Sequence, residues 1–240
     1  MVYGLRRHLA VAATRVAGLG AALLPPRCLL CGEPGTASLD LCAACHQALP
    51  RNQPACVRCA LPLAAAGTCG ACLHRPPLLA TVRAAFVYTA PLDRLLPRYK
   101  FRGDLAAGRL LARLMLAEVA GCDPPQALVP VPLHRARLRR RGYDQALELA
   151  RPLAAALGLP VHDSLLRRVR ATAAQSELDA TARRRNLHGA FQARSRGPVP
   201  AHVVLVDDVM TTGATLHAAA TALRRAGVAR VDAWVCARAP

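Results

Sequence analysis

The chain has 240 residues and carries a formal net charge of +18. This length suits one ordinary domain and a small additional module, and it is enough to bury a hydrophobic core. The positive charge favours phosphate-bearing partners. The aromatic side chains (one Trp, four Tyr and three Phe) are too few for a row of base-stacking platforms, which argues against a single-strand-binding surface of that type.

The N-terminal segment, residues 1–27, starts with basic residues and continues with apolar ones. Arg15 interrupts the apolar run, so no stretch approaches the roughly 20 residues that a membrane span requires. A secretory signal peptide has a similar beginning, but we expect an amphipathic helix that packs on the following module. We expect no membrane span and a cytoplasmic protein, in which cysteines stay reduced.

Eight cysteines follow as four CxxC pairs within residues 28–75, separated by short gaps of nine or ten residues. Two cysteines three positions apart in a tight turn can face one Zn²⁺, and a second such turn completes a tetrahedral site. We therefore expect a double zinc ribbon with two structural zinc ions. The simplest pairing is sequential, although the spacing is also compatible with an interleaved one. In the sequential pairing the ligand sets are Cys28, Cys31, Cys42 and Cys45, and Cys56, Cys59, Cys69 and Cys72.

Three other uses of these cysteines are weaker. Disulfides require an oxidising compartment, which the N-terminus does not support. A thioredoxin-like redox pair would leave three CxxC pairs unexplained, and covalent haem attachment at "CAACH", residues 42–46, would require export. Four thiolates leave no open coordination position, so the expected ions are structural rather than catalytic.

From about residue 80 the pattern changes to strands that alternate with helices. We expect apolar strands at 81–88, 127–133, 201–208 and 230–237. We expect amphipathic helices at 104–121, 143–158 (with an early kink at Pro152) and 214–227. This alternation predicts an α/β domain over residues 80–240, with a parallel sheet flanked by helices. Ligands of such sheets bind beyond the carboxyl ends of the strands.

The segment "VVLVDDVMTTGAT", residues 203–215, places Asp207 and Asp208 at that edge. Gly213 allows the backbone to approach a ligand, and the next helix offers its amides, which together form an anion cradle for one phosphate. The P-loop lysine is missing, which argues against a nucleoside triphosphate. Paired carboxylates suit two vicinal hydroxyls, so a ribose 5-phosphate fits. The hydroxyl donors are Thr211, Thr212 and Thr215. Alternatively, Asp207 only caps a helix and Asp208 is solvated.

This segment resembles the phosphoribosyl-pyrophosphate (PRPP) motif of type I phosphoribosyltransferases. Together with the CxxC pairs, "YKFRGD", "VPVPLHRARLRRRGYDQA" and "AAQSELDATARRRNLHGAF", it identifies the chain, over roughly residues 20–239, as similar to the ComF/GntX family. The resemblance implies a double zinc ribbon joined to a phosphoribosyltransferase-like domain. It also implies a link with DNA uptake in natural competence, and hence with competence proteins and single-stranded DNA as partners.

The resemblance assigns roles to individual residues. Asp207 and Asp208 would be the catalytic residues, because their carboxylates would hold the ribose hydroxyls. Mg²⁺ would bridge the oxygens of the departing pyrophosphate. The PRPP loop would comprise Val209, Met210, Thr211, Thr212, Gly213, Ala214 and Thr215. By the same resemblance, Gln175, Arg183 and Asn186 would belong to the cover over the site. From their place in the sequence, we expect Lys100, Arg139 and Arg141 to hold the pyrophosphate, since the arginines follow a strand end. Solvation explains the arginines of 135–141 about as well as function does.

The sequence departs from the family pattern at three positions. Asp144 stands where Asn is usual, Glu177 where Gly is common, and Ala182 where an acid is common. These changes affect the pyrophosphate loop and the cover more than the PRPP cradle, so they put turnover in more doubt than binding. The alternatives to an enzyme are a non-catalytic PRPP sensor or single-stranded-DNA-handling protein of the competence machinery, and a zinc-ribbon nucleic-acid adaptor. No acceptor pocket is readable from the sequence.

Overall fold

The computed structural model describes residues 26–36, 39–170, 187, 189–194 and 197–240. The chain forms two compact units, Met1–Leu49 and Pro50–Pro240. The division between them falls between the two cysteine sets, within the segment 28–75 that the sequence analysis treats as one module. The expected helix within residues 1–27 lies almost entirely outside the described residues.

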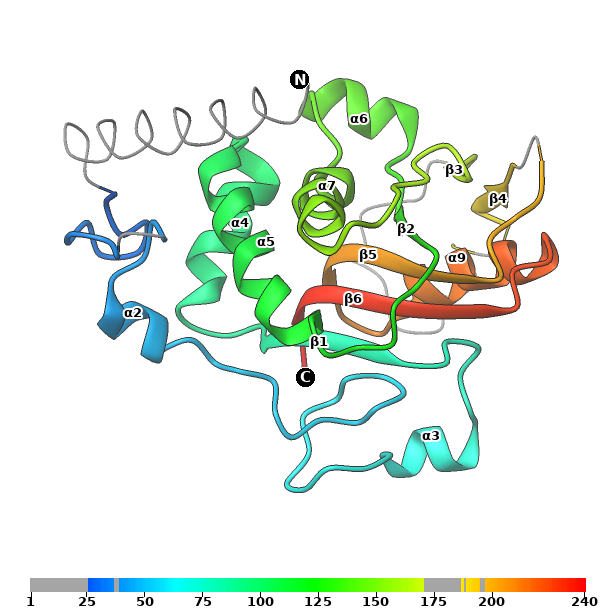
Figure 1. Ribbon diagram of the computed structural model, residues 1–240, viewed down its shortest axis with the longest axis horizontal. Coiled ribbons are helices and arrows are strands. Elements are labelled where there is room, and N and C mark those ends of the chain that lie inside the picture. Colours follow the sequence, from blue (N-terminus) through cyan, green and yellow to red (C-terminus); the bar gives the residue numbers. More distant parts are fainter. Residues whose placement is uncertain (1–25, 37–38, 171–186, 188, 195–196) are drawn as a thin grey trace, which may run out of the picture. The chain divides into compact units, whose positions relative to one another are not determined.

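The larger unit contains a four-stranded parallel sheet, as predicted (Figure 1). Its strands follow the order β1-β6-β5-β2, and β6 pairs with β1 on one side and with β5 on the other. The strands are β1 (Val82–Val87), β2 (Ala127–Pro130), β5 (His202–Met210) and β6 (Arg230–Arg238). All four are rich in buried apolar residues, because helices cover both faces of a parallel sheet.

Three helices contact one another or the sheet on one side, and one helix packs on the other (Figure 1). On the first side are α4 (Leu92–Arg102), α5 (Leu105–Val119) and α7 (Gln145–Leu157). On the second side α9 (Ala214–Arg225) packs against β5 and β6, and also against β4. The odd-numbered residues Val203, Leu205 and Val231 share a core cluster with α9, as the alternation of side chains along a strand requires.

Helix boundaries follow the capping residues in the sequence. Gly103 adopts a left-handed conformation (φ 68°) and ends α4, and the next residue, Asp104, caps α5 by accepting a hydrogen bond from the Ala107 amide at 3.0 Å. The expected kink at Pro152 does not interrupt α7, which continues on both sides of this residue.

Several elements were not expected. These are α4, α6 (Arg135–Arg141), the short helices α2 (Ala43–Gln47) and α3 (Gly70–His74), and the antiparallel pair β3 (Leu166–Arg168) and β4 (Phe191–Ala193). None of the helices in the described part of the chain combines the length and the apolar character that crossing a bilayer requires.

Strand β5 is longer than predicted. We expected it to end at Asp208, but Val209 and Met210 still pair with Ala237 and Arg238 of β6. The two aspartates therefore lie within the paired part of the strand, and two further residues of β5 pair with β6 after them. Strand β5 thus runs two residues past its predicted end and β6 one, and their pairing fixes the backbone of β5 up to the PRPP loop.

Candidate functional site

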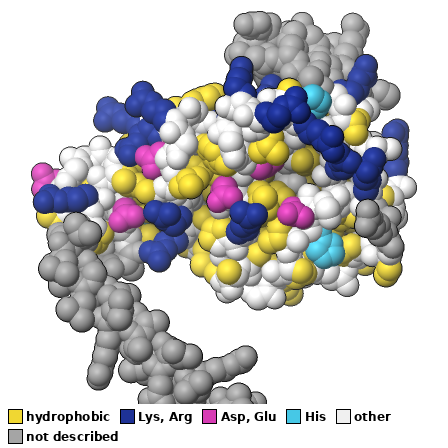
Figure 2. All heavy atoms as spheres, turned by 90° about the horizontal axis from the view of Figure 1, so that it is seen from above, with side chains coloured by type: hydrophobic (Ala, Val, Ile, Leu, Met, Phe, Trp, Pro, Cys, Tyr) yellow, Lys and Arg dark blue, Asp and Glu magenta, His cyan; other side chains and the backbone are white. Residues whose placement is uncertain are grey.

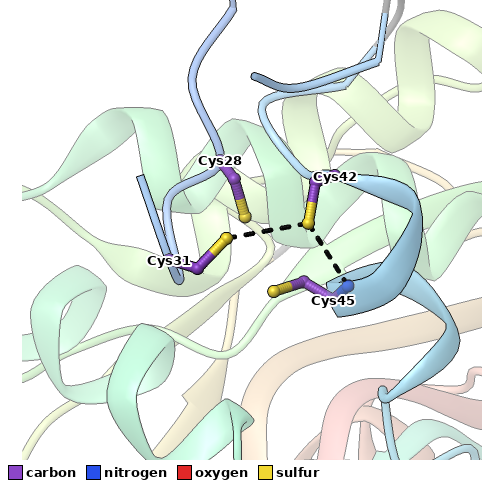
Figure 3. Close-up of side chains that lie close together, drawn as sticks. All are labelled: Cys28, Cys31, Cys42 and Cys45. Carbon is purple, nitrogen blue, oxygen red and sulfur yellow. Dashed lines mark hydrogen bonds between the residues drawn. The ribbon is translucent and has the colours of Figure 1, made fainter. Parts of the chain in front are cut away.

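The first cysteine set lies in the unit Met1–Leu49 and brings four thiols together (Figure 3). All four Sγ atoms lie within 4.8 Å of one another, and the Sγ atoms of Cys31 and Cys42 are 3.7 Å apart. Cys42 caps helix α2, and its Sγ accepts a hydrogen bond from the Cys45 amide at 3.4 Å. A tight turn and a helix N-terminus thus hold the two CxxC pairs face to face.

The second set repeats this arrangement in the unit Pro50–Pro240. Its four Sγ atoms also lie within 4.8 Å of one another, with 3.7 Å between Cys59 and Cys69. The Cys69 amide donates a hydrogen bond to the Sγ of Cys56 at 3.3 Å. Apart from Cys59, which is half-buried, the members of this set are buried.

Both sets fit a structural zinc ion. Four thiolates at the usual Zn–S distance of about 2.3 Å lie about 3.8 Å from one another in a tetrahedron, and the observed separations of 3.7 Å agree. A disulfide would need about 2.05 Å. The grouping is sequential, which decides between the two pairings that the spacing allowed.

The second set is joined to the sheet by hydrogen bonds. Arg58, between two of its cysteines, donates to the carbonyl oxygens of Ala80 (3.0 Å) and Pro77 (3.1 Å). Arg238, at the end of β6, donates to the carbonyl of Cys59 at 3.1 Å and to that of Met210 at 3.4 Å. Met210 immediately precedes the Thr-Thr-Gly turn, so one guanidinium connects the zinc-binding turn to the PRPP loop.

The two acids at the end of β5 have different surroundings. Asp208 is only 5% exposed, and its carboxylate forms an ion pair with Lys100, with 2.8 Å between Nζ and Oδ2. Asp207 is half-buried and lines a small hollow formed by the PRPP loop. Its Oδ1 accepts a hydrogen bond from the Asp208 amide at 2.9 Å. At the end of β5, the Asp208 side chain therefore contacts Lys100 of α4, whereas the Asp207 side chain lines the hollow of the PRPP loop.

Lys100 is positioned by the residues around it. The Tyr99 hydroxyl donates to the carbonyl of Gln145 at 2.6 Å, and the Tyr143 hydroxyl donates to the carbonyl of Tyr99. The Tyr99 ring fits against Gly108, where a Cβ atom would lie 2.4 Å from the ring. These contacts fasten the end of α4 to the start of α7. Lys100 lies in the last turn of α4, a helix that the sequence analysis did not predict.

The neighbouring charges shift the two aspartate pKa values in opposite directions. Burial raises the pKa of Asp208, but the charge and hydrogen bond of Lys100 outweigh burial and hold it below its ordinary value. Burial and the charge of Asp208 raise the pKa of Asp207 well above its ordinary value. The pair therefore behaves as one firmly ionised acid beside one acid that resists ionisation.

The PRPP loop forms the hollow that borders Asp207. Gly213 has φ 74° and caps α9, and a Cβ atom there would lie 2.5 Å from the Met210 Cε atom. The backbone angle therefore favours glycine at this position, whereas the flexible end of the Met210 side chain could move aside for a Cβ atom. The hollow has a volume of about 20 Å³. Its lining residues, apart from Asp207, are Val209, Met210, Thr211, Thr212, Gly213, Ala214, Thr215 and Leu216.

The basic residues after β2 form helix α6, which is largely exposed. Arg139 and Arg140 are exposed, whereas the Arg141 guanidinium lies 5.2 Å from the ring centre of Phe101. His134 caps α6 by accepting a hydrogen bond from the Ala136 amide at its Nδ1 atom, 3.3 Å away. Figure 2 shows basic side chains spread widely over one face of the molecule.

Other predicted site residues have different positions. Gln175, Arg183 and Asn186, assigned to the cover of the site, lie outside the described residues. Asp144, which stands where the family usually has Asn, caps α7 and also accepts a hydrogen bond from the Leu133 amide at 2.9 Å. Its carboxylate thus holds the loop after β2 to the start of α7.

Sequence reasoning missed the partners of the motif residues. It did not foresee the pairing of Lys100 with Asp208, or Arg238 as a link between the zinc-binding turn and the PRPP loop. One signal was available: Lys100 is the single lysine among 31 arginines. No comparable signal marked Arg238, because arginine is the common basic residue of this chain.

Comparisons with known proteins agree with this architecture. A model of the double zinc ribbon domain matches residues 19–73, and a model of the phosphoribosyl transferase domain matches residues 144–240. The chain is 40% identical over 226 residues to DNA utilization protein YhgH of Salmonella typhimurium, covering 90% of this chain and 98% of that protein. It is 37% identical over 223 residues to competence protein F of Haemophilus influenzae, covering 89% and 97%. The chain belongs to the ComF/GntX family.

A more distant ComF/GntX relative is competence protein ComFC of Bacillus subtilis. It is 29% identical over 198 residues, which cover 79% of this chain and 80% of that protein. Among solved structures, orotate phosphoribosyltransferase from Aeropyrum pernix matches with a TM-score of 0.36 and 24% identity, over 57% of this chain and 62% of that one.

The opposite pKa shifts predict opposite effects of two Asn substitutions on stability without ligand. The pKa of Asp207 is higher in the folded protein than in the unfolded chain. Its contribution to the free energy of unfolding is therefore fully present when the pH is below the unfolded-state pKa, and it is lost as the pH rises through the folded-state pKa. Asp207→Asn should therefore raise the melting temperature at about pH 8, and this gain should shrink towards about pH 5.

The pKa of Asp208 is lower in the folded protein than in the unfolded chain. Its contribution to the free energy of unfolding is therefore present when the pH is above the unfolded-state pKa, and it is lost only as the pH falls through the folded-state pKa. Asp208→Asn should destabilise the protein at neutral pH by roughly 1–3 kcal/mol, because Lys100 loses its partner. The loss is smaller than for a fully buried pair, since the Lys100 side chain is 31% exposed. Thermal melting of both variants from about pH 5 to 8 checks this, and equal effects of the two substitutions would contradict the assigned difference.

The two cysteine sets should differ in what depends on them. Purified protein should contain about two zinc ions, one for each set. Cys28→Ser and Cys59→Ser should each remove about one zinc ion, because serine is a poor zinc ligand. Only Cys59→Ser should lower the melting temperature of the sheet-containing unit, by at least about 5 °C, since a unit of this size loses 2–4 °C for each kcal/mol.

Elemental analysis and circular dichroism check this prediction, with Cys122→Ser as the control outside both sets. A Cys28→Ser variant that destabilises the sheet as much as Cys59→Ser does would show that the two sets support it equally.

Proposed function

We propose that this ComF/GntX protein binds PRPP, with the 5-phosphate in the PRPP loop and the ribose hydroxyls at Asp207 and Asp208. The observation that carries the proposal is the hollow of Thr211–Thr215 beside Asp207, at the carboxyl end of a buried parallel strand. Binding beyond this end is the rule for parallel sheets. The names of two relatives, competence protein F and DNA utilization protein YhgH, are consistent with a role in handling DNA.

The loop offers the donors that a phosphate needs. Helix α9 starts at Ala214, so its first amides and its positive end face the hollow. Hydroxyl groups of the threonines add neutral donors. The Thr212 hydroxyl oxygen accepts from the Ala214 amide at 3.4 Å, a long contact that a bound phosphate oxygen could replace. The site thus recognises a phosphate by directed hydrogen bonds, without a lysine in the loop.

The two acids would contribute differently to ribose binding. Asp208 is ionised and is already held by Lys100, so it offers an oriented acceptor to a hydroxyl group. Asp207 gains a donor when a ribose hydroxyl approaches, and this hydrogen bond favours its ionised form. Ligand binding would therefore relieve the electrostatic cost that Asp207 carries in the free protein.

For turnover, pyrophosphate must leave ribose C1 through an oxocarbenium-like transition state, and its charge must be stabilised. The carboxylate oxygens at the site suit a hard cation, and Mg²⁺ bound with the substrate would supply charge neutralisation to the pyrophosphate. Besides Lys100, which pairs with Asp208, the arginines of α6 are cations of this unit, and we propose that Arg139 and Arg141 help to hold the leaving group. The assignments of Gln175, Arg183 and Asn186 to a cover remain sequence-based proposals.

A second candidate function is nucleic-acid handling without catalysis. The exposed arginines of α6 and the net charge of +18 favour it, and so do the names of the relatives. In this reading the PRPP site serves as a sensor, and competence proteins and single-stranded DNA are the partners. Arg139 and Arg141 would serve both functions, but the contacts of the ribose and the 5-phosphate lie on β5 and the PRPP loop, so Asp207→Asn tests PRPP binding apart from α6.

Calorimetric titration with PRPP and Mg²⁺ tests the first function. Asp207→Asn should weaken PRPP binding by at least about tenfold, since a hydrogen bond to a charged group contributes roughly 1.5–3 kcal/mol and 1.4 kcal/mol corresponds to tenfold. Thr212→Val should also weaken binding, whereas Thr212→Ser keeps the hydroxyl and should bind nearly as well.

The matched control is Thr221→Val on α9, the helix that follows the loop, where the hydroxyl donates to the helix's own His217 carbonyl at 2.8 Å. Unchanged PRPP affinity in Asp207→Asn would sink the ribose assignment. A screen for pyrophosphate release with candidate acceptors then separates the enzyme from the sensor: binding without release for every acceptor favours the sensor.

DNA retention tests the second function. If the arginines of α6 neutralise DNA phosphates, the affinity for single-stranded DNA should fall steeply as the salt concentration rises, because binding releases counterions from the DNA. Replacing Arg139, Arg140 and Arg141 together with Gln should flatten the dependence of log affinity on log salt by about two units, at roughly 0.7 per contact on a single strand. An equal number of Arg→Gln changes on α5 and α9, at Arg109, Arg113 and Arg225, is the control. Equal flattening in both triple variants would remove α6 as the DNA-binding element.

A further inference from the structure

A second hollow, about 410 Å³ in volume, lies beside α9 and is far larger than the phosphate hollow. One wall is the segment Arg75–Leu78, which follows the second cysteine set. The opposite wall is the face of α9 that carries Ala214, Ala218 and Ala222, and Phe191 of β4 closes one side. Pockets of roughly 300–1,000 Å³ with apolar walls and few polar groups are typical of small-molecule sites.

The wall formed by Arg75–Leu78 is fixed rather than loosely attached. Arg58 donates hydrogen bonds to the carbonyls of Pro77 and Ala80, on either side of Leu79, which is fully buried. Arg58 itself lies between two zinc-binding cysteines. The zinc-binding turn therefore positions this wall, and the pocket is part of the folded unit rather than a gap beside a loop.

The α9 wall leaves room because its side chains are small. Alanines at every fourth position, Ala214, Ala218 and Ala222, lie on one face of the helix. Thr221, which also lines the pocket, donates its hydroxyl to the carbonyl of His217 within the same helix. A larger side chain on this face would fill the space that the structure keeps open.

The charges around the pocket have a single sign. Arg75 and Arg225 line it, both exposed, and no Asp or Glu of the described residues does so. The remaining lining combines proline, leucine, alanine and phenylalanine side chains with Thr212, His217 and Thr221, and Leu78 is an exposed apolar residue. Ring faces suit proline and guanidinium surfaces, and guanidinium groups pair with carboxylate or phosphate oxygens.

We propose that this pocket binds a second small molecule, one that combines an apolar ring system with a carboxylate, sulfonate or phosphate group. The ring would lie between Pro76–Leu78 and the alanine face of α9, and the anion would face Arg75 and Arg225. The pocket is distinct from the PRPP hollow but shares Thr212 and Ala214 with it. The two ligands would therefore meet at the start of α9, although the proposal does not require that PRPP binds.

A matched pair of probes tests the pocket: 2-naphthoate, and the neutral 2-naphthylmethanol of the same size. The full zinc-loaded chain should bind 2-naphthoate at least about threefold more tightly than the alcohol, the effect of one or two partly solvated ion pairs. The double variant Arg75→Gln and Arg225→Gln should remove this preference. Arg109→Gln, which removes an exposed charge on α5, should leave it unchanged.

A second variant tests the position of the ring. Ala218→Leu fills the pocket and should abolish binding of both probes, whereas Ala117→Leu, at an exposed position on α5, should not. No binding of 2-naphthoate by the natural sequence would overturn the proposal, and so would equal affinity for the alcohol or unchanged binding in Ala218→Leu. A parallel PRPP titration reports on the phosphate hollow alone, so failure of the proposed function and failure of this pocket are distinguishable.

Discussion

The candidate site depends on how one buried carboxylate is neutralised. Asp208 lies at the end of a strand that is covered on both faces, where an unpaired charge would be costly. Lys100 supplies the counter-charge from α4, and the hydrogen bonds among Tyr99, Tyr143 and Gln145 keep α4 in place. Because this pairing serves Asp208, the second acid, Asp207, remains available to the hollow of the PRPP loop. Lys100 and Asp208 belong to motifs that lie far apart in the sequence, and their ion pair joins these motifs in the fold.

Much of this arrangement could be predicted from the sequence, because strong local patterns encode it. Apolar runs specified the strands, CxxC spacing specified the two thiol sets, and Gly213 marked the turn. Helix α4 was missed because "LDRLLPRYKFR" contains Pro97 and many charged residues, which obscure its apolar face. The pairing of Lys100 with Asp208 joins residues about a hundred positions apart, and such a contact leaves no local pattern. Burial of Asp208 was missed for the same reason, since it depends on how far β6 extends.

The two cysteine sets show that identical local chemistry can serve different structural purposes. The first set orders a short segment around α2. The second set borders the main core: Ala60, directly after Cys59, is 1% exposed and belongs to the same core cluster as the sheet residues. Ala60 adopts a left-handed conformation (φ 54°) that normally favours glycine. Its methyl group packs in the core, which offsets part of this conformational cost. The zinc-binding turn is therefore shaped by the sheet as well as by the metal.

The strand order has a consequence for protein synthesis. β6 lies between β1 and β5, and it is the last strand of the sheet to emerge from the ribosome. Until residues 230–238 have emerged, β1 and β5 each expose an unpaired apolar edge, and such edges readily pair with other chains. The zinc-binding turn and the PRPP loop also lack the Arg238 guanidinium that connects them. The nascent chain can therefore complete its sheet only after the other three strands have been synthesised.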